Sequence, residues 1–268
     1  MKKKYISMIV LLILVFVLYK SINMNQTRED NEATAKVDTA NPSIEPNQIT
    51  PDSQFPDIMI DFKKQTNTDY FIPENIINLT EKDIVKTYQA KEYDGYQFMV
   101  CLDTKNVLHI AYFKDSSYWS MCQIDNWTTE GESDPFDNMN HDRDVFSTFQ
   151  DVLGSSGIKI NILVGAAASD IFYIAMDDTP HLLLSDSISG DFTEYDIDQN
   201  GQKELMAYDN YMYIKTSEDI DKATYQISGD VKQVIFDEAS GLFRVFFSNN
   251  IEKTYQYDKS KKILTLYK

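Results

Sequence analysis

One short stretch, residues 196–205, carries side chains whose types and spacing suit the binding of a cation. It reads DIDQNGQKEL, so oxygen-bearing side chains alternate along it before a glycine. Gly201 allows the backbone conformation of a tight turn, on which alternate positions direct their oxygens toward one centre. Five residues are the candidate ligands, with Gln202 acting through its backbone carbonyl: Asp196, Asp198, Asn200, Gln202 and Glu204. All the donors are hard oxygens, which favours Ca²⁺ as a structural cofactor over Mg²⁺.

The length of this pattern argues against an EF-hand. An EF-hand loop takes a bidentate glutamate at its twelfth position, which here is Ala207, in a segment with the composition of a strand. The pattern D-x-D-x-N-G-x-x-E-L between two strands resembles instead the nine-residue calcium loops of FG-GAP and VCBS-type repeats, over about residues 190–214. The resemblance implies the same five ligands and a calcium ion that is structural rather than catalytic. The alternative is an Asp/Asn/Gly turn that holds no ion, because these residues are common turn formers.

The N-terminus predicts where the chain is located. Lys2 to Lys4 precede an apolar run from Ile6 to Leu18 that only Ser7 interrupts. This run falls between the ~7–15 apolar residues of a cleavable signal peptide and the ~20 of a membrane-spanning helix. Because no small-residue cleavage site follows closely, we expect an uncleaved single-pass anchor in the cell membrane, with a cleaved signal peptide as the alternative. The positive-inside rule then places these lysines in the cytoplasm and the C-terminal domain outside it.

Composition divides the chain into three parts. Residues 1–20 form the predicted cytoplasmic tip and transmembrane anchor. Residues 21–57 are rich in Asn, Thr, Asp, Glu and Pro and have no hydrophobic period, which is typical of a disordered stalk. Aromatic and β-branched residues are frequent in residues 58–268, which predicts an extracytoplasmic β-rich domain with a core of its own. The formal net charge of −17 disfavours nucleic acid as a partner.

The domain is expected to be mostly β, built of antiparallel meanders with one or two packed helices. Short apolar segments joined by turn residues favour strands, most clearly at 96–124 and 231–267. Two segments favour helices: 80–89, which starts with Thr80 as a candidate N-cap, and 145–153, whose apolar side chains share a helical face. Because four strands in succession resemble a propeller blade, a small β-propeller is the alternative fold.

Two cysteines and a histidine fall in the first predicted meander. The expected register places Cys101 and Cys122 on its outer strands, facing His109 from opposite sides. Two strand spacings of ~4.8 Å exceed the ~7 Å limit for a disulfide, so free thiols are expected. A Cys-His-Cys row could hold a metal, but packed thiols beside a hydrogen-bonded histidine are the simpler interpretation. The acidic loop at 125–144 is expected to be solvated, with a lid or a second cation site as the alternative.

Sequence motifs of the common enzyme classes are missing. There is no H-E-x-x-H, G-x-S-x-G, G-x-G-x-x-G or P-loop. His141 and His181 lie far from His109 in the sequence, and a carboxylate pair such as Asp177 and Asp178 is expected by chance in so acidic a chain. We therefore expect a membrane-anchored binding or interaction domain that contacts the membrane through its N-terminus and binds a protein or a glycan. The alternative is a carboxylate-dependent hydrolase of cell-surface polymers.

Overall fold

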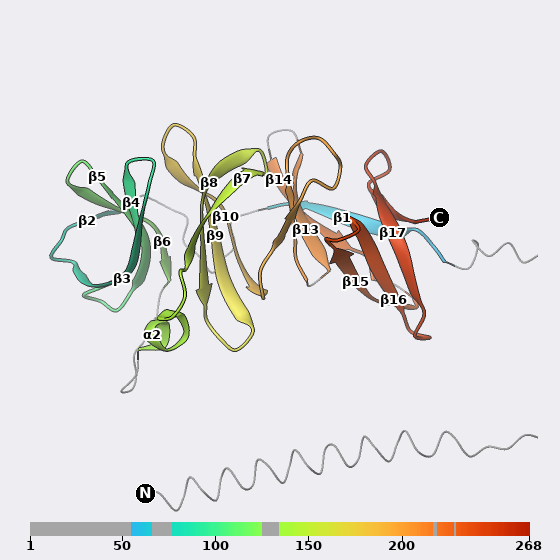
Figure 1. Ribbon diagram of the computed structural model, residues 1–268, viewed down its shortest axis with the longest axis horizontal. Coiled ribbons are helices and arrows are strands. Elements are labelled where there is room, and N and C mark those ends of the chain that lie inside the picture. Colours follow the sequence, from blue (N-terminus) through green and yellow to red (C-terminus); the bar gives the residue numbers. More distant parts are fainter. Residues whose placement is uncertain (1–54, 66–76, 125–133, 209, 217–218, 228) are drawn as a thin grey trace, which may run out of the picture. The chain divides into compact units, whose positions relative to one another are not determined.

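The structure is a computed structural model that describes residues 55–65, 77–124, 134–208, 210–216, 219–227 and 229–268 (Figure 1). Strands account for most of these residues, and the pairs of neighbouring strands are antiparallel. The helix α2 (Pro135–Asn140) is the one helix in the ranges just given. The described part of the chain is therefore mostly β.

Four meanders of four strands follow one another along this part of the chain. The first contains β3 (Ile84–Tyr93), β4 (Tyr96–Asp103), β5 (Leu108–Lys114) and β6 (Ser117–Ile124), with β2 (Ile77–Leu79) paired to β6. The second contains β7 (Phe146–Val152), β8 (Ser155–Leu163), β9 (Ala168–Met176) and β10 (Pro180–Ser189). The third contains β11 (Thr193–Tyr195), β12 (Glu204–Met206), β13 (Tyr211–Thr216) and β14 (Asp219–Tyr225). The fourth contains β15 (Val231–Asp237), β16 (Leu242–Phe247), β17 (Glu252–Asp258) and β18 (Ile263–Leu266).

The strand β1 (Ile58–Lys64) joins the third and fourth meanders edge to edge. Residues 60–64 pair with β14, and Ile58 and Met59 pair with β18. The described strands of both meanders thus form one sheet in the order β11-β12-β13-β14-β1-β18-β17-β16-β15. The small β-propeller considered as an alternative is wrong, because a propeller keeps its blades as separate sheets around a channel.

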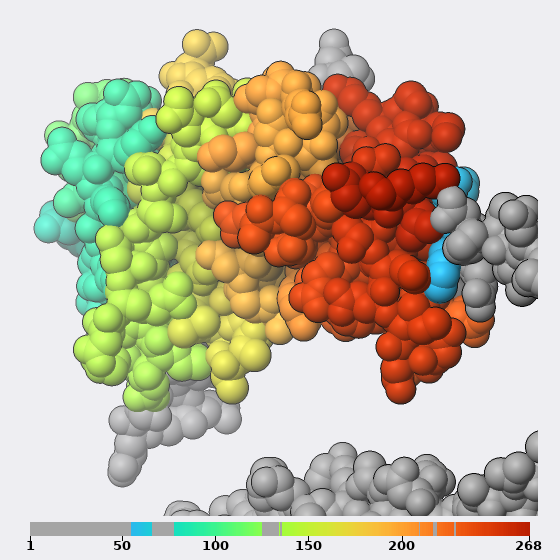
Figure 2. Space-filling model, turned by 45° about the vertical axis from the view of Figure 1, so that its right-hand side comes forward, coloured from blue at the N-terminus to red at the C-terminus, as the bar shows by residue number. Residues whose placement is uncertain are grey.

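Apolar cores lie between and within these sheets. One packs the first meander against the second, with Phe98 and Phe172 among its buried residues. Another packs the second meander against the third, with Tyr173 and Leu205. A further core draws residues from both halves of the sheet that β1 completes, including Ile60 itself. In the space-filling view the orange surface of the third meander and the red surface of the fourth meet directly (Figure 2).

The tight hairpins use positive backbone angles. Asp94 and Gly95 connect β3 to β4 with φ of 51° and 74°, the conformation that a two-residue hairpin of type I′ requires. Leu153 and Gly154 connect β7 to β8 in the same way, with φ of 49° and 75°. A left-handed conformation costs a residue such as leucine ~1–2 kcal/mol. Leu153 offsets this cost because its side chain is buried in the core between the second and third meanders.

Both segments expected to be helical are strands. The first, residues 80–89, begins with a closed turn in which the Asp83 amide donates to the Thr80 carbonyl at 2.9 Å. The Asp83 carboxylate in turn accepts from the Thr80 amide at 2.8 Å and from its hydroxyl at 2.7 Å. The apparent helix cap is therefore a turn that leads into β3, whose Ile84 and Val85 are β-branched and suit a strand.

The second segment, residues 145–153, contains β7, and its helical spacing has a structural cause. Buried residues recur at every third position of this strand. Between Phe149 and Val152 the register with β8 shifts, and Asp151 in this irregularity has a φ of 56°. An irregularity of this kind moves the side chains that follow it to the other face of the sheet. Phe146 is buried in the core with the first meander and Phe149 in the core with the third. The first interval of three therefore reflects a strand buried on both faces, and the bulge accounts only for the second interval, from Phe149 to Val152.

The expected fold class is wrong in its helical parts. No helix among the described residues is long and apolar enough to cross a membrane. The anchor predicted at 1–20 lies outside the described residues, and so does the predicted stalk except for residues 55–57. Within the described ranges, the expected one or two helices of the β domain are replaced by the single turn-and-a-half of α2.

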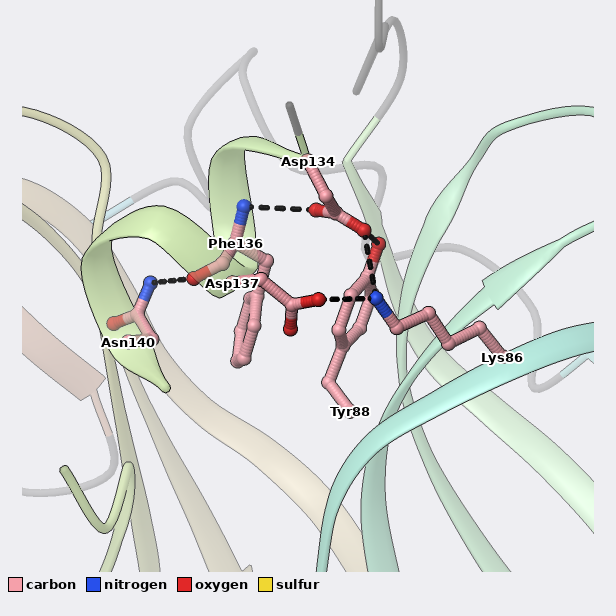
Figure 3. Close-up of polar contacts among 6 residues, drawn as sticks. All are labelled: Lys86, Tyr88, Asp134, Phe136, Asp137 and Asn140. Atoms are coloured by element: carbon pink, nitrogen blue, oxygen red, sulfur yellow. Dashed lines mark hydrogen bonds and ion pairs between the residues drawn. The ribbon is translucent and has the colours of Figure 1, made fainter. Parts of the chain in front are cut away.

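The helix α2 is fixed to β3 by a polar cluster (Figure 3). Asp134 caps the helix by accepting from the Phe136 amide at 3.0 Å. The same carboxylate accepts from the Tyr88 hydroxyl at 2.7 Å and from Lys86 Nζ at 3.0 Å, and Lys86 also contacts Asp137. Phe136 is buried and stacks on the Tyr88 ring at 4.4 Å between centroids. The described end of the acidic loop therefore contains a short packed helix, in which Phe136 and Asn140 are buried. Its residues exposed to solvent are Asp137, Asn138, His141 and Asp142. Residues 125–133 lie outside the described residues.

Candidate metal centre

The five predicted ligands lie in the connection between β11 and β12. Tyr195 and Glu204 are directly paired across this hairpin. Asp196, which follows Tyr195, therefore lies at one base of the connection and Glu204 at the other. The short strands bring the first and last ligands together, and the intervening residues must turn back on themselves. Gln199 and Gly201 do so with φ of 57° and 87°.

Three of the predicted ligands converge. Single carboxylate oxygens of Asp196, Asp198 and Glu204 all lie within 4.8 Å of one another. We refer to these three side chains as the acidic triad. Asp196 is oriented by two backbone amides, because Asn200 N–H donates to one oxygen at 2.9 Å and Gly201 N–H to the other at 2.8 Å. The triad could therefore bind a metal ion.

Glu204 is the buried member of the triad. It is 2% exposed, and one of its oxygens accepts from the Ile197 amide at 2.9 Å. Burial raises the pKa of this carboxyl to about 7; the Ile197 N–H opposes the shift, and the nearby Asp198 and Asp196 carboxylates add to it. The ionised form of Glu204 is thus disfavoured unless positive charge compensates the triad.

A lysine of the fourth meander forms an ion pair with the triad. Lys259, in the turn between β17 and β18, places Nζ 2.8 Å from Asp198 Oδ2. The Asp198 side chain is only 4% exposed, whereas that of Lys259 is 59% exposed. The hydrogen bond to Asp198 raises the pKa of Lys259. Tyr257 also lies close: burial raises its pKa to about 12, with further contributions from Asp198 and Glu204.

The remaining two predicted ligands are placed differently. The Asn200 side-chain oxygen accepts from the Gln202 amide at 2.7 Å, so it stabilises the turn. The Asn200 and Gly201 side of the loop is exposed. Gln202 directs its side chain toward Gly154, where a Cβ would meet Gln202 Oε1 at 3.1 Å. Asn200 and Gln202 therefore lie in the same loop as the triad, with side chains that make contacts of their own.

The second meander supports this loop through backbone hydrogen bonds to Lys203. Lys203 N–H donates to the Asp151 carbonyl at 2.6 Å, and Leu153 N–H donates to the Lys203 carbonyl at 2.9 Å. These bonds connect the residue before Glu204 to the turn between β7 and β8. The candidate site is thus assembled from three meanders. Sequence reasoning missed Lys259, Tyr257 and the β7–β8 turn, because nothing local to residues 196–205 indicates them.

The cysteines do not form the predicted row. Cys101 pairs with His109, as expected, but Cys122 pairs with Ile110 and so faces the other side of the sheet. Both thiols are free and buried, and burial raises the pKa of each to about 12. A thiol of this kind is a poor metal ligand, because metal binding needs the thiolate. The interpretation as packed thiols is the one that fits.

His109 has neighbours that the sequence did not reveal. Its Nδ1 lies 2.8 Å from the Ser120 hydroxyl, and its Nε2 lies 3.2 Å from an Asp103 oxygen. These are the residue types of a hydrolase triad, but in that triad Nε2 faces the serine and Nδ1 the aspartate. His109 and Ser120 are each 2% exposed, so no substrate reaches the hydroxyl. The arrangement is a buried polar contact of the first meander.

The other residues considered from the sequence lie at the surface. Asp177 and Asp178 are exposed in the turn between β9 and β10, where Asp177 is 3.8 Å from His181 Nε2. His141, which follows α2, is exposed and lies 2.8 Å from Asp142. Neither group is brought to the acidic triad.

Comparisons with known proteins add no relative. No protein-family model, curated protein or solved structure matches the chain.

Proposed function

We propose that the chain is an extracytoplasmic binding domain in which the loop of residues 196–204 holds a structural Ca²⁺ ion. The observation that carries the proposal is the convergence of Asp196, Asp198 and Glu204 within 4.8 Å. Three carboxylates at this distance repel one another, and a divalent cation with a preference for oxygen relieves that repulsion. The likeness to FG-GAP and VCBS-type calcium loops supports the same ion, because their ligands have the same spacing.

The ion is proposed to stabilise the fold rather than to take part in a reaction. The loop lies where three meanders meet, so an ion there would fix the β11–β12 hairpin against its neighbours. All the proposed ligands come from one loop. The ion would therefore act by holding the backbone of the hairpin in one conformation.

The partner is proposed to be a protein or a glycan. An open groove of about 620 Å³ runs beside the C-terminal strand and is lined by Tyr267 together with Gln256 and Thr265. Tyr267 is 50% exposed, and an exposed aromatic ring flanked by polar groups suits either class of ligand. Attachment to the cell membrane through residues 1–20 stays a prediction from the sequence.

A carboxylate-dependent hydrolase is less well supported. Its two carboxylates would have to face one substrate. Asp170 and Asp186 are two buried carboxylates of the second meander, each 8% exposed. Asp170 pairs with Ile162, whose face contacts the first meander, whereas Asp186 pairs with Ile171, whose face contacts the third. The two carboxylates thus point to opposite faces of one sheet.

Calcium titration of the whole chain tests the proposal. An ion that binds only the folded state adds ~2.7 kcal/mol of stability at a hundredfold excess over its Kd. For a domain of this size the melting temperature should rise by roughly 6–10 °C. Asp198→Ala should abolish most of this rise, because it removes the central ligand, and it should change the melting temperature in EGTA much less.

The matched control is Asp177→Ala, which removes the same charge from an exposed turn. It should keep the full calcium-dependent rise. If millimolar Ca²⁺ leaves the wild-type melting temperature unchanged, and calorimetry detects no heat of binding, the loop is only a turn.

A further inference from the structure

The acidic triad already contacts one cation, and that cation belongs to the chain. Lys259 Nζ lies 2.8 Å from Asp198 Oδ2. Lys259 comes from the fourth meander, whereas the triad belongs to the third. The contact is therefore independent of the loop's own hydrogen bonds. A positive charge from another hairpin therefore lies in direct contact with the triad.

We propose that Lys259 is a built-in competitor for the metal ion, which occupies Asp198 until the ion displaces it. The proposal rests on the proposed function, because it concerns the occupancy of the same site. Asp198 has two oxygens to offer: Oδ1 accepts from the Asn200 amide at 3.2 Å, and Oδ2 contacts Lys259. An ion that binds Asp198 must therefore share an oxygen with one of these donors or replace it.

The ammonium is the donor that can leave. The Asn200 amide is part of the loop backbone and also approaches Asp196 at 2.9 Å, so its removal would require the loop to refold. The Lys259 side chain is 59% exposed, and its four-carbon stem is flexible. Two positive charges this close also repel each other. Binding of the ion should thus release Lys259 into solvent.

The β17–β18 turn keeps its shape without the Lys259 contact. Asp258 Oδ1 accepts from the Ser260 amide at 3.0 Å, the Ser260 hydroxyl at 2.6 Å and the Lys261 amide at 3.1 Å. Lys262 N–H donates to the Asp258 carbonyl at 2.7 Å. None of these bonds uses the Lys259 side chain. A substitution of Lys259 therefore tests the charge without changing the turn.

The competition has two consequences. It raises the Ca²⁺ concentration at which the site fills, because each binding event must break the Lys259–Asp198 ion pair. The competition also changes what holds the loop in place. Without the ion, the Lys259 ammonium connects the third meander to the fourth. With the ion bound, the ligands of the loop itself fix its conformation. Lys259 is accordingly a residue that sets the affinity of the site rather than a ligand.

The experiment uses isothermal calorimetry with CaCl₂ on the whole chain and three variants. Lys259→Met removes the ammonium and keeps the length of the side chain. Its Kd for Ca²⁺ should fall by up to about fivefold, the upper end of what an ion pair with an exposed lysine contributes. Lys259→Arg keeps the cation and should bind within about twofold of the wild type. Lys261→Met removes the same charge from the same turn, where Lys261 contacts Asp258 at 3.4 Å, and should also stay near the wild type.

A second measurement uses the unaltered chain and does not depend on the folding of a variant. Amine acetylation followed by mass spectrometry reports how freely each lysine reacts. Ca²⁺ should raise the labelling rate of Lys259 severalfold and leave that of Lys261 unchanged.

The outcomes separate the two proposals. Equal calcium affinity of Lys259→Met and the wild type, with unchanged labelling of Lys259, would overturn the competition while the calcium site stands. Absence of binding to the wild type and to Lys259→Met alike would overturn the calcium site. Binding to Lys259→Met alone would show that the ammonium closes the site of the natural chain, which supports the competition and contradicts the proposed calcium-bound state.

Discussion

At the scale of single residues, the second meander shows two ways to bury a carboxylate. Asp186 accepts from the Tyr211 and Tyr213 hydroxyls at 2.7 Å each, and Lys222 Nζ lies 3.6 Å away. Asp170 has weaker compensation. Burial raises its pKa; a hydrogen bond with Ser187 opposes this shift, and the Asp186 charge adds to it. A buried carboxylate is tolerated where donors surround it and is costly where they do not.

The raised pKa of Asp170 predicts how stability depends on pH. The folded state holds the proton more tightly than the unfolded state, so the stability loss appears as the pH rises above the ordinary pKa of an aspartate. Asp170→Asn should therefore increase the free energy of unfolding at pH 7 relative to the wild type. The gain should disappear near pH 3, where the wild-type carboxyl is protonated in both states. Chemical denaturation at a series of pH values measures the difference.

Asp144→Asn is the control of opposite sign. Burial acts to raise the pKa of Asp144, but hydrogen bonds from the Phe146 amide and Lys91 outweigh it, and the net shift is downward. A lowered pKa contributes stability that is present above the ordinary value and lost as the pH falls. This variant should be less stable than the wild type at pH 7. A pH profile of the same sign for both variants would contradict the assignment of their surroundings.

At the scale of elements, a single asparagine connects α2 to the second meander. Asn140 is fully buried, and its side chain donates to the Leu163 carbonyl at 3.1 Å and accepts from the Leu163 amide at 2.9 Å. It therefore pairs with the end of β8 much as a neighbouring strand would. This contact and the Asp134 cluster hold the short helix in position, because a helix of this length is only marginally stable by itself.

Replacement of Asn140 should destabilise the domain. Asn140→Ala leaves the amide and carbonyl of Leu163 without their partner and opens a small cavity. We expect a loss of about 2–4 kcal/mol in the free energy of unfolding, since each unsatisfied buried group costs ~1–3 kcal/mol. Asn138→Ala, on the exposed side of the same helix, should stay within ~0.5 kcal/mol of the wild type. Urea denaturation compares the two; equal midpoints would show that the Asn140 contact contributes little.

The elements also show what the sequence could predict. The region 231–267, expected to form strands, contains β15 to β18, and the expected segments in 96–124 correspond to β4, β5 and β6. These strands lie between clear turn signals and their apolar residues suit a sheet. The expected helices failed because propensity and spacing were both misleading: β7 contains a bulge, and the Thr80 cap is a turn. Local patterns do not reveal an irregularity that only strand pairing creates.

The candidate site likewise has one part that the sequence predicts and one part that it does not. Asp196, Asp198 and Glu204 were predicted together because they lie within one contiguous loop whose hairpin pairing brings its ends together. Lys259 and Tyr257 could not be predicted, because their position depends on how the third and fourth meanders pack. That packing depends in turn on β1 and on the core to which Ile60 contributes.

At the scale of the whole described molecule, β1 makes two meanders into one cooperative sheet. A destabilising substitution in the fourth meander should therefore also destabilise the third. Leu264 is fully buried and pairs with Ile58 of β1, whose next residues pair with β14. Leu264→Ala should lower the free energy of unfolding by about 2–5 kcal/mol. It should also lower the hydrogen-exchange protection of the β14 amides.

The control is a change in the same meander that does not touch β1. Arg244→Ala removes an exposed ion pair with Glu252 and should leave exchange in β14 unaltered. If Leu264→Ala affects exchange in the fourth meander alone, the two meanders open independently and β1 does not couple them.

The position of β1 has a consequence for how the protein folds during its synthesis on the ribosome. This strand belongs to the earliest part of the described chain, yet its partners, β14 and β18, come much later in the sequence. At a synthesis rate of ~5–20 residues per second, residue 264 is made roughly ten to forty seconds after Ile58 and Ile60, and β1 lacks its β18 partner during that time. The first two meanders can fold during that interval, because their pairings are local. A chain without β18 would leave one edge of β1 open to other chains, so residues 263–266 protect the sheet from edge-to-edge aggregation.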